Sequence, residues 1–151
     1  MPEEFAQDEH NLMGSLNLIH EKAQKDIYVL LQPTSPLRDT KGIKQWINDF
    51  IVHKEMLSGA AIFELPKKYF YYINRPLNFL PQDRDGNGCE KDPIFYETGS
   101  FYIFRKEVLK ETFILKAPWV LYRDTIGIDL DTNRDWIRGE QLKYEFWDKR
   151  K

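Results

Sequence analysis

The chain has 151 residues, of which 22 are lysine or arginine and 24 are aspartate or glutamate, so its formal net charge is −2. This balance argues against a general nucleic-acid-binding protein, because such proteins gain much of their affinity from an excess of basic side chains. The length indicates one domain with its own core, and an aromatic content of 15% favours a packed globule over a disordered chain.

Two further features bear on the cellular compartment. The single cysteine, Cys89, cannot form an internal disulfide, which fits a reducing cytosol. No apolar run approaches the ~20 residues needed to cross a bilayer, and the first residues lack the basic and apolar regions of a signal peptide. We therefore expect a soluble, cytoplasmic protein with neither membrane nor nucleic acid as a partner.

The first third of the chain predicts a helix, a strand and a second helix. Residues 8–25 carry apolar side chains at helical spacing, which indicates an amphipathic helix: Leu12, Leu16, Ile19 and Ala23. Residues 27–31 predict a short buried strand, and a proline-containing loop follows it. Asp39 or Thr40 can cap the next helix, which would present one apolar face: Ile43, Ile47, Phe50 and Ile51.

The remainder of the chain predicts further strands, a short helix at 106–111 and a terminal helix from Asn133. The expected strands cover residues 59–65, 69–73, 100–104 and 119–122. Residues 74–93 form a long irregular segment, which is more typical of a lid or binding loop than of a simple connector. In the terminal helix we expect Trp136, Ile137 and Phe146 to point inward. Alternating strands and helices predict an α/β fold with a largely parallel sheet, in which ligands bind at the carboxyl ends of strands.

A loop bounded by prolines follows the first predicted strand. Pro33 and Pro36 each remove a backbone donor and restrict the local dihedral angles, which predicts a stiff shelf at the strand end. The shelf offers four polar side chains: Gln32, Thr34, Ser35 and Arg38. Gln32 both donates and accepts hydrogen bonds, which suits hydroxyl and carboxylate groups of a ligand. From the residues alone, the favoured interpretation is a rigid connector, with Arg38 paired to a carboxylate at a helix terminus.

A pair of carboxylates, Asp129 and Asp131, forms the second candidate site. If this segment is extended, both side chains project to one face, because strand side chains alternate. Adjacent carboxylates repel unless a cation lies between them, and Mg²⁺ typically uses one or two carboxylates together with phosphate oxygens. The alternative is a helix start, with Asp131 or Thr132 as N-cap and Asp135 complementing the helix dipole. The spacing of the acids favours the magnesium site and the helix start equally, and the two interpretations are compatible.

The segment 30–38, Leu-Leu-Gln-Pro-Thr-Ser-Pro-Leu-Arg, resembles the signature of cytidylyltransferases that activate acidic sugars such as sialic acid. The segment 129–132, Asp-Leu-Asp-Thr, is similar to the Asp-Ile-Asp-Thr element that holds the metal in that family. The resemblance implies that Asp129 and Asp131 are catalytic and bind Mg²⁺. It also implies that the polar residues of the proline-bounded loop contact the substrate.

Two further segments match the same family in the same order. Residues 96–103 look like its Tyr-x-x-Asn-Gly-x-x-Tyr element beside the acidic sugar, with Thr98 in place of the frequent asparagine. Gly99 would permit close approach of the backbone. The resemblance implies that Thr98, Gly99 and Tyr102 bind the sugar, although Tyr102 alone would be assigned to a core strand. Residues 1–8 resemble an Arg-Pro-x-x-Leu-Ala-x-Asp element, with Met1 at the position of a nucleotide-binding arginine.

The resemblance covers nearly the whole chain and implies a Rossmann-like nucleotide-diphospho-sugar transferase fold with a mostly parallel sheet. Such enzymes open with a strand and a Gly-, Arg- and Lys-rich loop that cradles the triphosphate. Nothing in residues 1–151 resembles that loop. We therefore expect a single, partial domain over 1–151 that lacks the N-terminal strand and phosphate loop, which would leave an unpaired sheet edge. The family further implies a homodimer, and the missing part suggests a separate N-terminal segment as a partner.

The implied function is an enzyme that transfers CMP from CTP to an acidic sugar, sialic acid or a related nonulosonic acid, and releases pyrophosphate. The anomeric hydroxyl would attack the α-phosphate, while Mg²⁺ offsets charge on the phosphates. The alternative is a catalytically inactive sugar-binding or interaction module derived from that family. The missing loop and Met1 favour the module, whereas the paired acids favour the enzyme. Keto-deoxyoctulosonate is a further candidate sugar, and the sequence does not separate these substrates.

Overall fold

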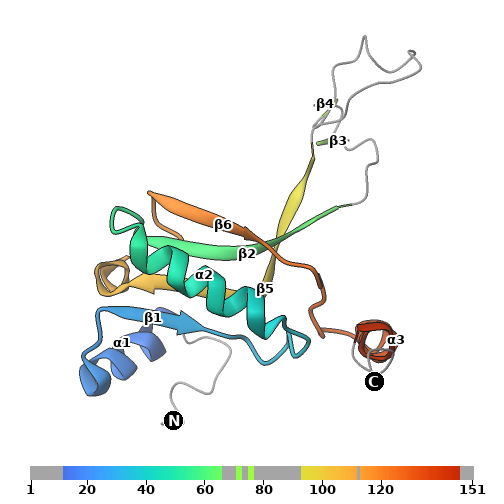
Figure 1. Cartoon of the computed structure of the whole chain (residues 1–151), viewed down its shortest axis with the longest axis horizontal. Coiled ribbons are helices and arrows are strands. Elements are labelled where there is room, and N and C mark those ends of the chain that lie inside the picture. Colours follow the sequence, from blue (N-terminus) through green and yellow to red (C-terminus); the bar gives the residue numbers. More distant parts are fainter. Residues whose placement is uncertain (1–11, 66–70, 73–74, 77–92, 112, 147–151) are drawn as a thin grey trace.

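The computed structural model describes residues 12–65, 71–72, 75–76, 93–111 and 113–146. These residues form a four-stranded sheet with helices on both faces, together with a short two-stranded ladder (Figure 1). The elements, in chain order, are α1 Leu12–Ala23, β1 Ile27–Leu30, α2 Thr40–Val52, β2 Ser58–Glu64, β3 Tyr71–Tyr72, β4 Arg75–Pro76, β5 Phe95–Arg105, the 3-10 helix η3 Lys106–Lys110, β6 Trp119–Arg123 and α3 Asn133–Phe146.

The main sheet has the strand order β1-β5-β2-β6. β5 is antiparallel to both of its neighbours, whereas β2 and β6 are parallel. β1, β2 and β6 therefore run in one direction, which confirms an α/β fold with mostly parallel strands. The sheet is nevertheless mixed in its pairing, because the opposing strand lies between β1 and β2. β1 and β6 are the two outer strands, and their carboxyl ends lie at the same end of the sheet. The two candidate loops follow these strand ends.

α1 covers one face of the sheet and confirms the first predicted helix, apart from residues 8–11, which lie outside the described ranges. Met13 and Leu16 are buried against Phe104, Val108 and Leu109. The predicted apolar face is partly wrong, since Leu12 is 41% and Ile19 is 52% exposed. The helix contacts the sheet along a narrow stripe, so only part of its apolar surface is covered.

α2 packs on the opposite face of the sheet. Its N-cap is Asp39, as predicted, and the Asp39 carboxylate accepts a 3.0 Å hydrogen bond from the amide of Lys41. Phe50 is fully buried, and Trp46 stacks on Tyr122. Ile51 is 48% exposed, contrary to expectation. Trp46 and Phe50 lie toward one side of the predicted apolar stripe. α2 is therefore rotated about its axis relative to the prediction, and this leaves Ile51 exposed.

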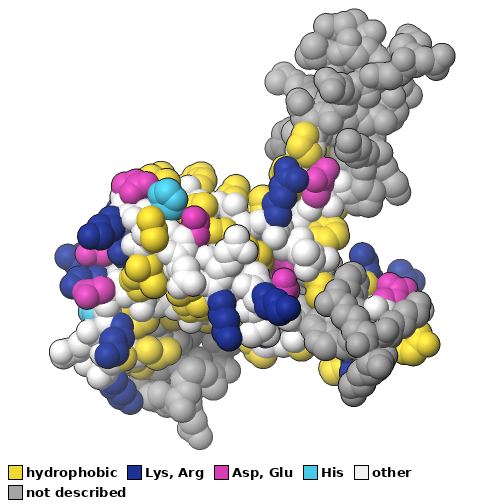
Figure 2. All heavy atoms as spheres, viewed as in Figure 1, with side chains coloured by type: hydrophobic (Ala, Val, Ile, Leu, Met, Phe, Trp, Pro, Cys, Tyr) yellow, Lys and Arg dark blue, Asp and Glu magenta, His cyan; other side chains and the backbone are white. Residues whose placement is uncertain are grey.

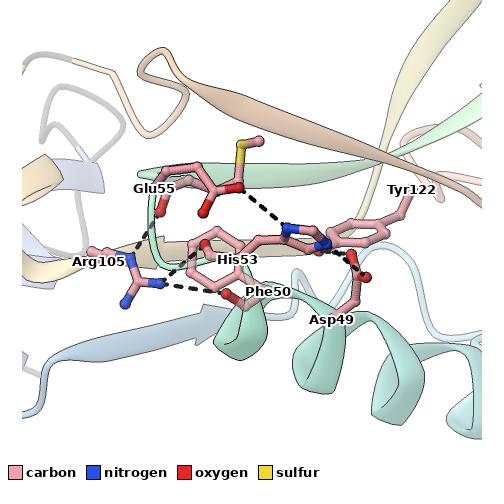
Figure 3. Close-up of polar contacts among 7 residues, drawn as sticks. Asp49, Phe50, His53, Glu55, Arg105 and Tyr122 are labelled. Atoms are coloured by element: carbon pink, nitrogen blue, oxygen red, sulfur yellow. Dashed lines mark hydrogen bonds and ion pairs between the residues drawn. The ribbon is translucent and has the colours of Figure 1, made fainter.

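The C-terminal end of α2 is held by Arg105, at the end of β5 (Figure 3). The Arg105 guanidinium donates hydrogen bonds to the carbonyls of Met56, Phe50 and His53, at 2.8, 3.4 and 3.3 Å. It also lies over the Phe50 ring, 5.0 Å from the centroid. His53 is the C-cap of α2, and its imidazole is 3.2 Å from Glu55. These contacts satisfy carbonyl groups that a helix end leaves without partners.

β5 extends over Phe95–Arg105, well beyond the predicted 100–104. Its register with β2 shifts between the pair Ala60–Tyr102 and the pair Ile62–Glu97. Residues 98–101 therefore bulge out of the ladder opposite Ala61, which is a local break of the kind found beside functional sites. Figure 1 shows the first part of β5 rising away from the body of the sheet.

The remaining elements follow the prediction in outline. The short helix at 106–111 is present as η3, and the strand at 119–122 as β6. The strand predicted at 69–73 is described only as β3, which pairs with β4; residues 77–92 of the predicted long segment lie outside the described ranges. None of the helices among the described residues is long and apolar enough to span a bilayer.

α3 begins at Asn133, as predicted, but its apolar side chains do not point inward. Trp136 is 57% and Ile137 is 63% exposed, while the side chain of Phe146 lies outside the described residues. The helix contacts the rest of the chain where the buried Gly139 lies near Leu130. On the face shown in Figure 2, hydrophobic side chains reach the surface around α3, and basic and acidic side chains are interspersed rather than gathered in one patch.

Candidate functional site

A cleft of about 430 Å³ opens near the carboxyl end of β1. Its polar side consists of Gln32, Glu97 and Tyr102. The opposite side is apolar and is contributed by α1 and the segment after η3: Leu12, Met13, Phe113, Ile114 and Leu115. The structure thus places two of the predicted sugar-binding residues, Gln32 and Tyr102, in one cavity. Glu97 and the apolar residues were not predicted.

The proline-bounded loop is fastened to β5 by two of its own predicted site residues. Arg38 donates through Nε to the carbonyl of Ser100, at 2.8 Å, and through its terminal nitrogen to the carbonyl of Gln32. Ser35 is fully buried and donates a 2.9 Å hydrogen bond to the carbonyl of Thr98. Within the described ranges, no carboxylate at a helix terminus pairs with Arg38, contrary to expectation. Both side chains face the β5 bulge and give the loop its fixed shape.

Gly99 lies in the bulge of β5 and has a φ of 68°, which favours glycine. A Cβ atom at this position would overlap Oε1 of Gln32. The glycine therefore allows close approach, as expected, and the group that approaches it is the Gln32 side chain. This contact joins the middle of β5 to the polar end of the cleft.

Thr98 and Ser100 flank Gly99 and share a buried carboxylate, Asp124, which follows β6. Ser100 Oγ donates to Asp124 Oδ2 at 2.6 Å, and Thr98 Oγ1 donates to the same oxygen at 3.2 Å. Thr98 is only 1% exposed. Its hydroxyl therefore faces the interior, and a direct sugar contact by this side chain would require these bonds to be displaced. Asp124 was not predicted, since a lone acid after a strand matches no motif.

Tyr102 lies on β5 and donates a 3.1 Å hydrogen bond to Oε2 of Glu97. Burial raises the pKa of Tyr102 to about 12, and the carboxylates of Glu97 and Asp129 add to the shift. The phenol is therefore a neutral donor at physiological pH.

The acidic segment is bound to the proline-bounded loop rather than paired as a strand. Residues 126–130 pair in no strand, and the projection of Asp129 and Asp131 to one face stays a prediction. The amide of Leu130 donates a 2.8 Å hydrogen bond to the carbonyl of Thr34. The carbonyl of Gly127 accepts a 2.9 Å hydrogen bond from the hydroxyl of Tyr96. These bonds hold the segment beside the cleft.

The two predicted acids differ in environment. Asp131 is exposed, whereas Asp129 Oδ1 is buried and has no hydrogen-bond partner among the described residues. The helix-start alternative is confirmed for the next residues. Thr132 donates through its amide and hydroxyl to Oδ2 of Asp135, at 2.8 and 2.7 Å. These bonds lower the pKa of Asp135 and form a capping box, which leaves Asp131 outside the cap.

The donor set fits Mg²⁺ held partly by a substrate. In the described part of the chain, no three His, Cys, Asp or Glu side chains are grouped to hold a metal ion. Mg²⁺ in nucleotide sites commonly uses only one or two carboxylates and takes its other ligands from phosphates and water. A buried carboxylate oxygen without a partner is costly unless a cation or donor reaches it. Asp129, with the exposed Asp131 beside it, has the character that such an ion requires.

Comparison with known proteins supports a partial relationship to the cytidylyltransferases. No protein-family model matches the chain. The CMP-N,N'-diacetyllegionaminic acid synthase of Legionella pneumophila (strain Philadelphia 1) is 26% identical over 153 residues, covering 93% of this chain and 66% of that protein. A CMP:2-keto-3-deoxy-manno-octonic acid synthetase complexed with CTP has a similar fold, with a TM-score of 0.56 and 14% identity, over 90% of this chain and 70% of the other. The chain thus spans about two thirds of the length of the proteins it matches.

Proposed function

We propose, from this relationship, that the chain carries the sugar-binding cleft and the metal-binding acids of a cytidylyltransferase that acts on an acidic sugar. The observation that carries the proposal is the hydrogen bond between Leu130 and Thr34. It holds the segment that contains Asp129 beside the loop that contains Gln32, so the proposed metal-binding acid and the proposed sugar-binding amide lie on two segments that are bonded to each other. Neither segment alone would indicate more than a connector or a helix start.

The reaction is the transfer of CMP from CTP to the anomeric hydroxyl of the sugar. A bond forms between this oxygen and the α-phosphorus, and the bond from the α-phosphorus to pyrophosphate breaks. Gln32 offers an amide donor and a carbonyl acceptor to the sugar, and Tyr102 offers a phenol that stays protonated because its pKa is about 12. Asp129 and Asp131 would hold Mg²⁺, which supplies charge neutralisation for the phosphates when it is bound.

The apolar side of the cleft supports an N-acylated sugar acid, such as sialic acid or a related nonulosonic acid, over keto-deoxyoctulosonate. Leu12, Ile114 and Leu115 are among the residues that line this side, and acyl methyl groups gain about 0.8 kcal/mol for each buried carbon. Keto-deoxyoctulosonate carries hydroxyl groups instead. We expect KM for N-acetylneuraminate to be lower than KM for keto-deoxyoctulosonate, by about fourfold for each methyl group that is buried. Equal KM values for the two sugars would contradict this preference.

A triphosphate-binding loop is proposed to reach the cleft from a further strand that pairs along β1. β1 is at the edge of the sheet and, among the described strands, pairs only with β5. Val29 is 40% and Leu31 is 44% exposed along this edge. A strand added here would bury that surface and bring its loop to the carboxyl edge of the sheet. Among the described residues that line the cleft none is basic, so the triphosphate needs cations from other parts of the protein.

The first experiment measures pyrophosphate release by the purified chain with CTP, Mg²⁺ and N-acetylneuraminate. It is repeated with Asp131→Ala and with a peptide or domain that supplies the phosphate loop. Release that requires both the added segment and Asp131 supports the proposal. Sugar binding without any release, even with the segment present, would instead favour the catalytically inactive sugar-binding module. That the cleft residues in the described part of the chain include no basic side chain is the observation on the side of that alternative.

The partners include a second copy of the chain. The exposed Trp136 and Ile137 of α3 support a homodimer, because large apolar side chains at a surface gain stability when a partner covers them. Sedimentation of the chain and of the double variant Trp136→Ser, Ile137→Ser tests this. We expect a dimer that the double variant converts to monomer; a monomeric parent chain would contradict the proposal.

A further inference from the structure

We infer that Asp124 is a positioning residue for the cleft: its buried carboxylate acts through Ser100 and Arg38 to fix both the proline-bounded loop and the acidic segment. The inference rests on the proposed function for its catalytic consequence. Its structural part stands independently, because it concerns contacts within the chain. Asp124 is not among the residues that line the cleft, so any effect on substrates must pass through other residues.

Both carboxylate oxygens of Asp124 are used. Oδ2 accepts the hydrogen bonds from Ser100 and Thr98, at 2.6 and 3.2 Å, and Oδ1 accepts a 3.1 Å bond from the amide of Ile126. The amide of Asp124 donates to the carbonyl of Ile62 at 2.7 Å. The residue is only 9% exposed. A carboxylate this far from solvent is retained only when several donors satisfy it.

Ser100 joins this carboxylate to Arg38. Its hydroxyl donates to Asp124, while its carbonyl accepts the 2.8 Å bond from Arg38 Nε. No ion pair within 4.0 Å links Arg38 and Asp124 themselves, as far as the described residues show. Burial lowers the pKa of Arg38, and the charge of Asp124 opposes this. The two opposite charges therefore compensate each other across a serine instead of by direct contact.

The hydrogen bonds that link Asp124, Ser100 and Arg38 form a network that reaches the start of both candidate loops. On one side Arg38 holds the carbonyl of Gln32, whose side chain lies against Gly99 and lines the cleft. On the other side Asp124 holds the amide of Ile126, which begins the segment leading to Asp129. Loss of the network should therefore loosen the bond between Leu130 and Thr34, where the two loops meet.

Hydrogen exchange of the Leu130 amide, followed by NMR on the full chain without substrate, tests the inference. The variants are Ser100→Ala, which removes one donor from the network, and Asp124→Asn, which removes the charge. The matched control is Ser58→Ala, since Ser58 is also a fully buried serine of the sheet but bonds to Lys116. We expect Leu130 to exchange about tenfold faster in the two network variants, the factor expected for the loss of one hydrogen bond to a charged group.

A purely structural role predicts a different pattern. In that case exchange in α2 and at Leu130 would rise by the same factor in Ser100→Ala, as it would in the Ser58→Ala control, and this result would overturn the inference. Ser100→Ala retains Asp124 and decides the question even if Asp124→Asn fails to fold. This measurement needs no activity, so it separates the inference from the proposed function.

The effect of the network on catalysis is measured as the Michaelis constants for the acidic sugar and for CTP. In Ser100→Ala we expect KM for the acidic sugar to rise about tenfold and KM for CTP to rise less, because Ser100 bonds to the Arg38 that holds the Gln32 loop, whereas the bond from Ile126 to Asp124 remains. An equal rise of both constants would overturn the assignment to the sugar side. If no pyrophosphate is released even with the added phosphate-loop segment, the proposed function fails and the exchange experiment still decides whether Asp124 positions the loops.

Discussion

The amide of Leu130 lies 2.8 Å from the carbonyl of Thr34, and this hydrogen bond joins two segments almost a hundred positions apart in the chain. Each segment on its own has an ordinary explanation, as a stiff connector or as a helix start. The bond holds the segment that contains the buried oxygen of Asp129 against the loop whose Gln32 side chain lines the cleft. The bond is therefore the structural basis for treating the two motifs as one site.

The substitution Gly99→Ala is predicted to weaken both the fold and sugar binding. Gly99 has a φ of 68°, and an added Cβ would displace Oε1 of Gln32. The strained backbone should lower the free energy of unfolding by about 1–2 kcal/mol. The displaced amide should raise KM for the sugar by at least tenfold. Urea denaturation and steady-state kinetics give the two numbers.

Gly42→Ala is the matched control for this prediction. Gly42 lies in the first turns of α2, where a helical backbone suits alanine, and the nearest atom to an added Cβ is the end of the Asp39 side chain, 3.1 Å away. We expect this variant to keep the parent KM. A KM for Gly99→Ala that also matches the parent would show that Gln32 does not contact the sugar.

Asp129→Asn is predicted to separate metal binding from stability. Without Mg²⁺ the variant should unfold no more easily than the parent, because it removes a charge from a buried oxygen that has no partner in the described structure. With saturating Mg²⁺ and CTP the parent should gain about 2.7 kcal/mol at one hundred times Kd, and the variant should gain almost nothing. Thermal unfolding with and without these ligands provides the measurement.

Asp135→Asn controls for a nearby acid with another role. Asp135 accepts the hydrogen bonds of Thr132 in the capping box of α3, so its replacement should destabilise the start of the helix and leave the ligand-dependent gain intact. If both variants lost that gain equally, the acids would act through the fold of the segment and the metal assignment to Asp129 would fail.

The sequence predicted those parts of the fold that local rules control. The Asp39 cap, the start of α3 and the strands β2 and β6 follow from capping chemistry and apolar patterning, and the structure has them within a residue or two. The full length of β5 was missed, since its bulge contains Gly99 and polar residues that interrupt a strand pattern. Such a bulge is stable because the proline-bounded loop packs against it, which is tertiary information.

The same distinction applies to the site. Gln32 and Tyr102 were recognised from motifs, and the structure brings them into one cleft. Asp124 was invisible in the sequence, because its role depends on burial and on hydroxyl groups from β5. The inward orientation expected for Trp136 and Ile137 was wrong, because an apolar pattern shows that a helix has a face to cover without showing whether this chain covers it.

Arg105→Ala is predicted to destabilise the fold without changing substrate affinity. The guanidinium bonds to carbonyls at the end of α2 and lies over the Phe50 ring (Figure 3). Loss of these contacts should cost about 2–3 kcal/mol of unfolding free energy, while both Michaelis constants stay near the parent values. Urea denaturation measures the loss. Arg134→Ala, at an exposed position of α3, should cost less than about 0.5 kcal/mol; equal losses in the two variants would refute a specific cap.

Stability is predicted to fall as the pH rises from about 10 to about 12, and Tyr102 contributes to this fall. Its pKa is raised to about 12 in the folded chain by burial and by the Glu97 and Asp129 carboxylates, whereas an unfolded tyrosine titrates near 10. Between these values the unfolded chain binds fewer protons than the folded chain, so stability decreases with pH. Below pH 10 both states are protonated, and Tyr102 then causes no pH dependence.

Tyr102→Phe tests this assignment by urea denaturation at a series of pH values. The variant should show a shallower loss of unfolding free energy across the alkaline window than the parent. Part of the slope should remain, because burial and the Asp49 carboxylate also raise the pKa of Tyr122, and Tyr122→Phe should remove that part. An unchanged alkaline slope in Tyr102→Phe would mean that its phenol titrates normally. It would then not be the half-buried phenol beside Glu97 on which its proposed place in the cleft depends.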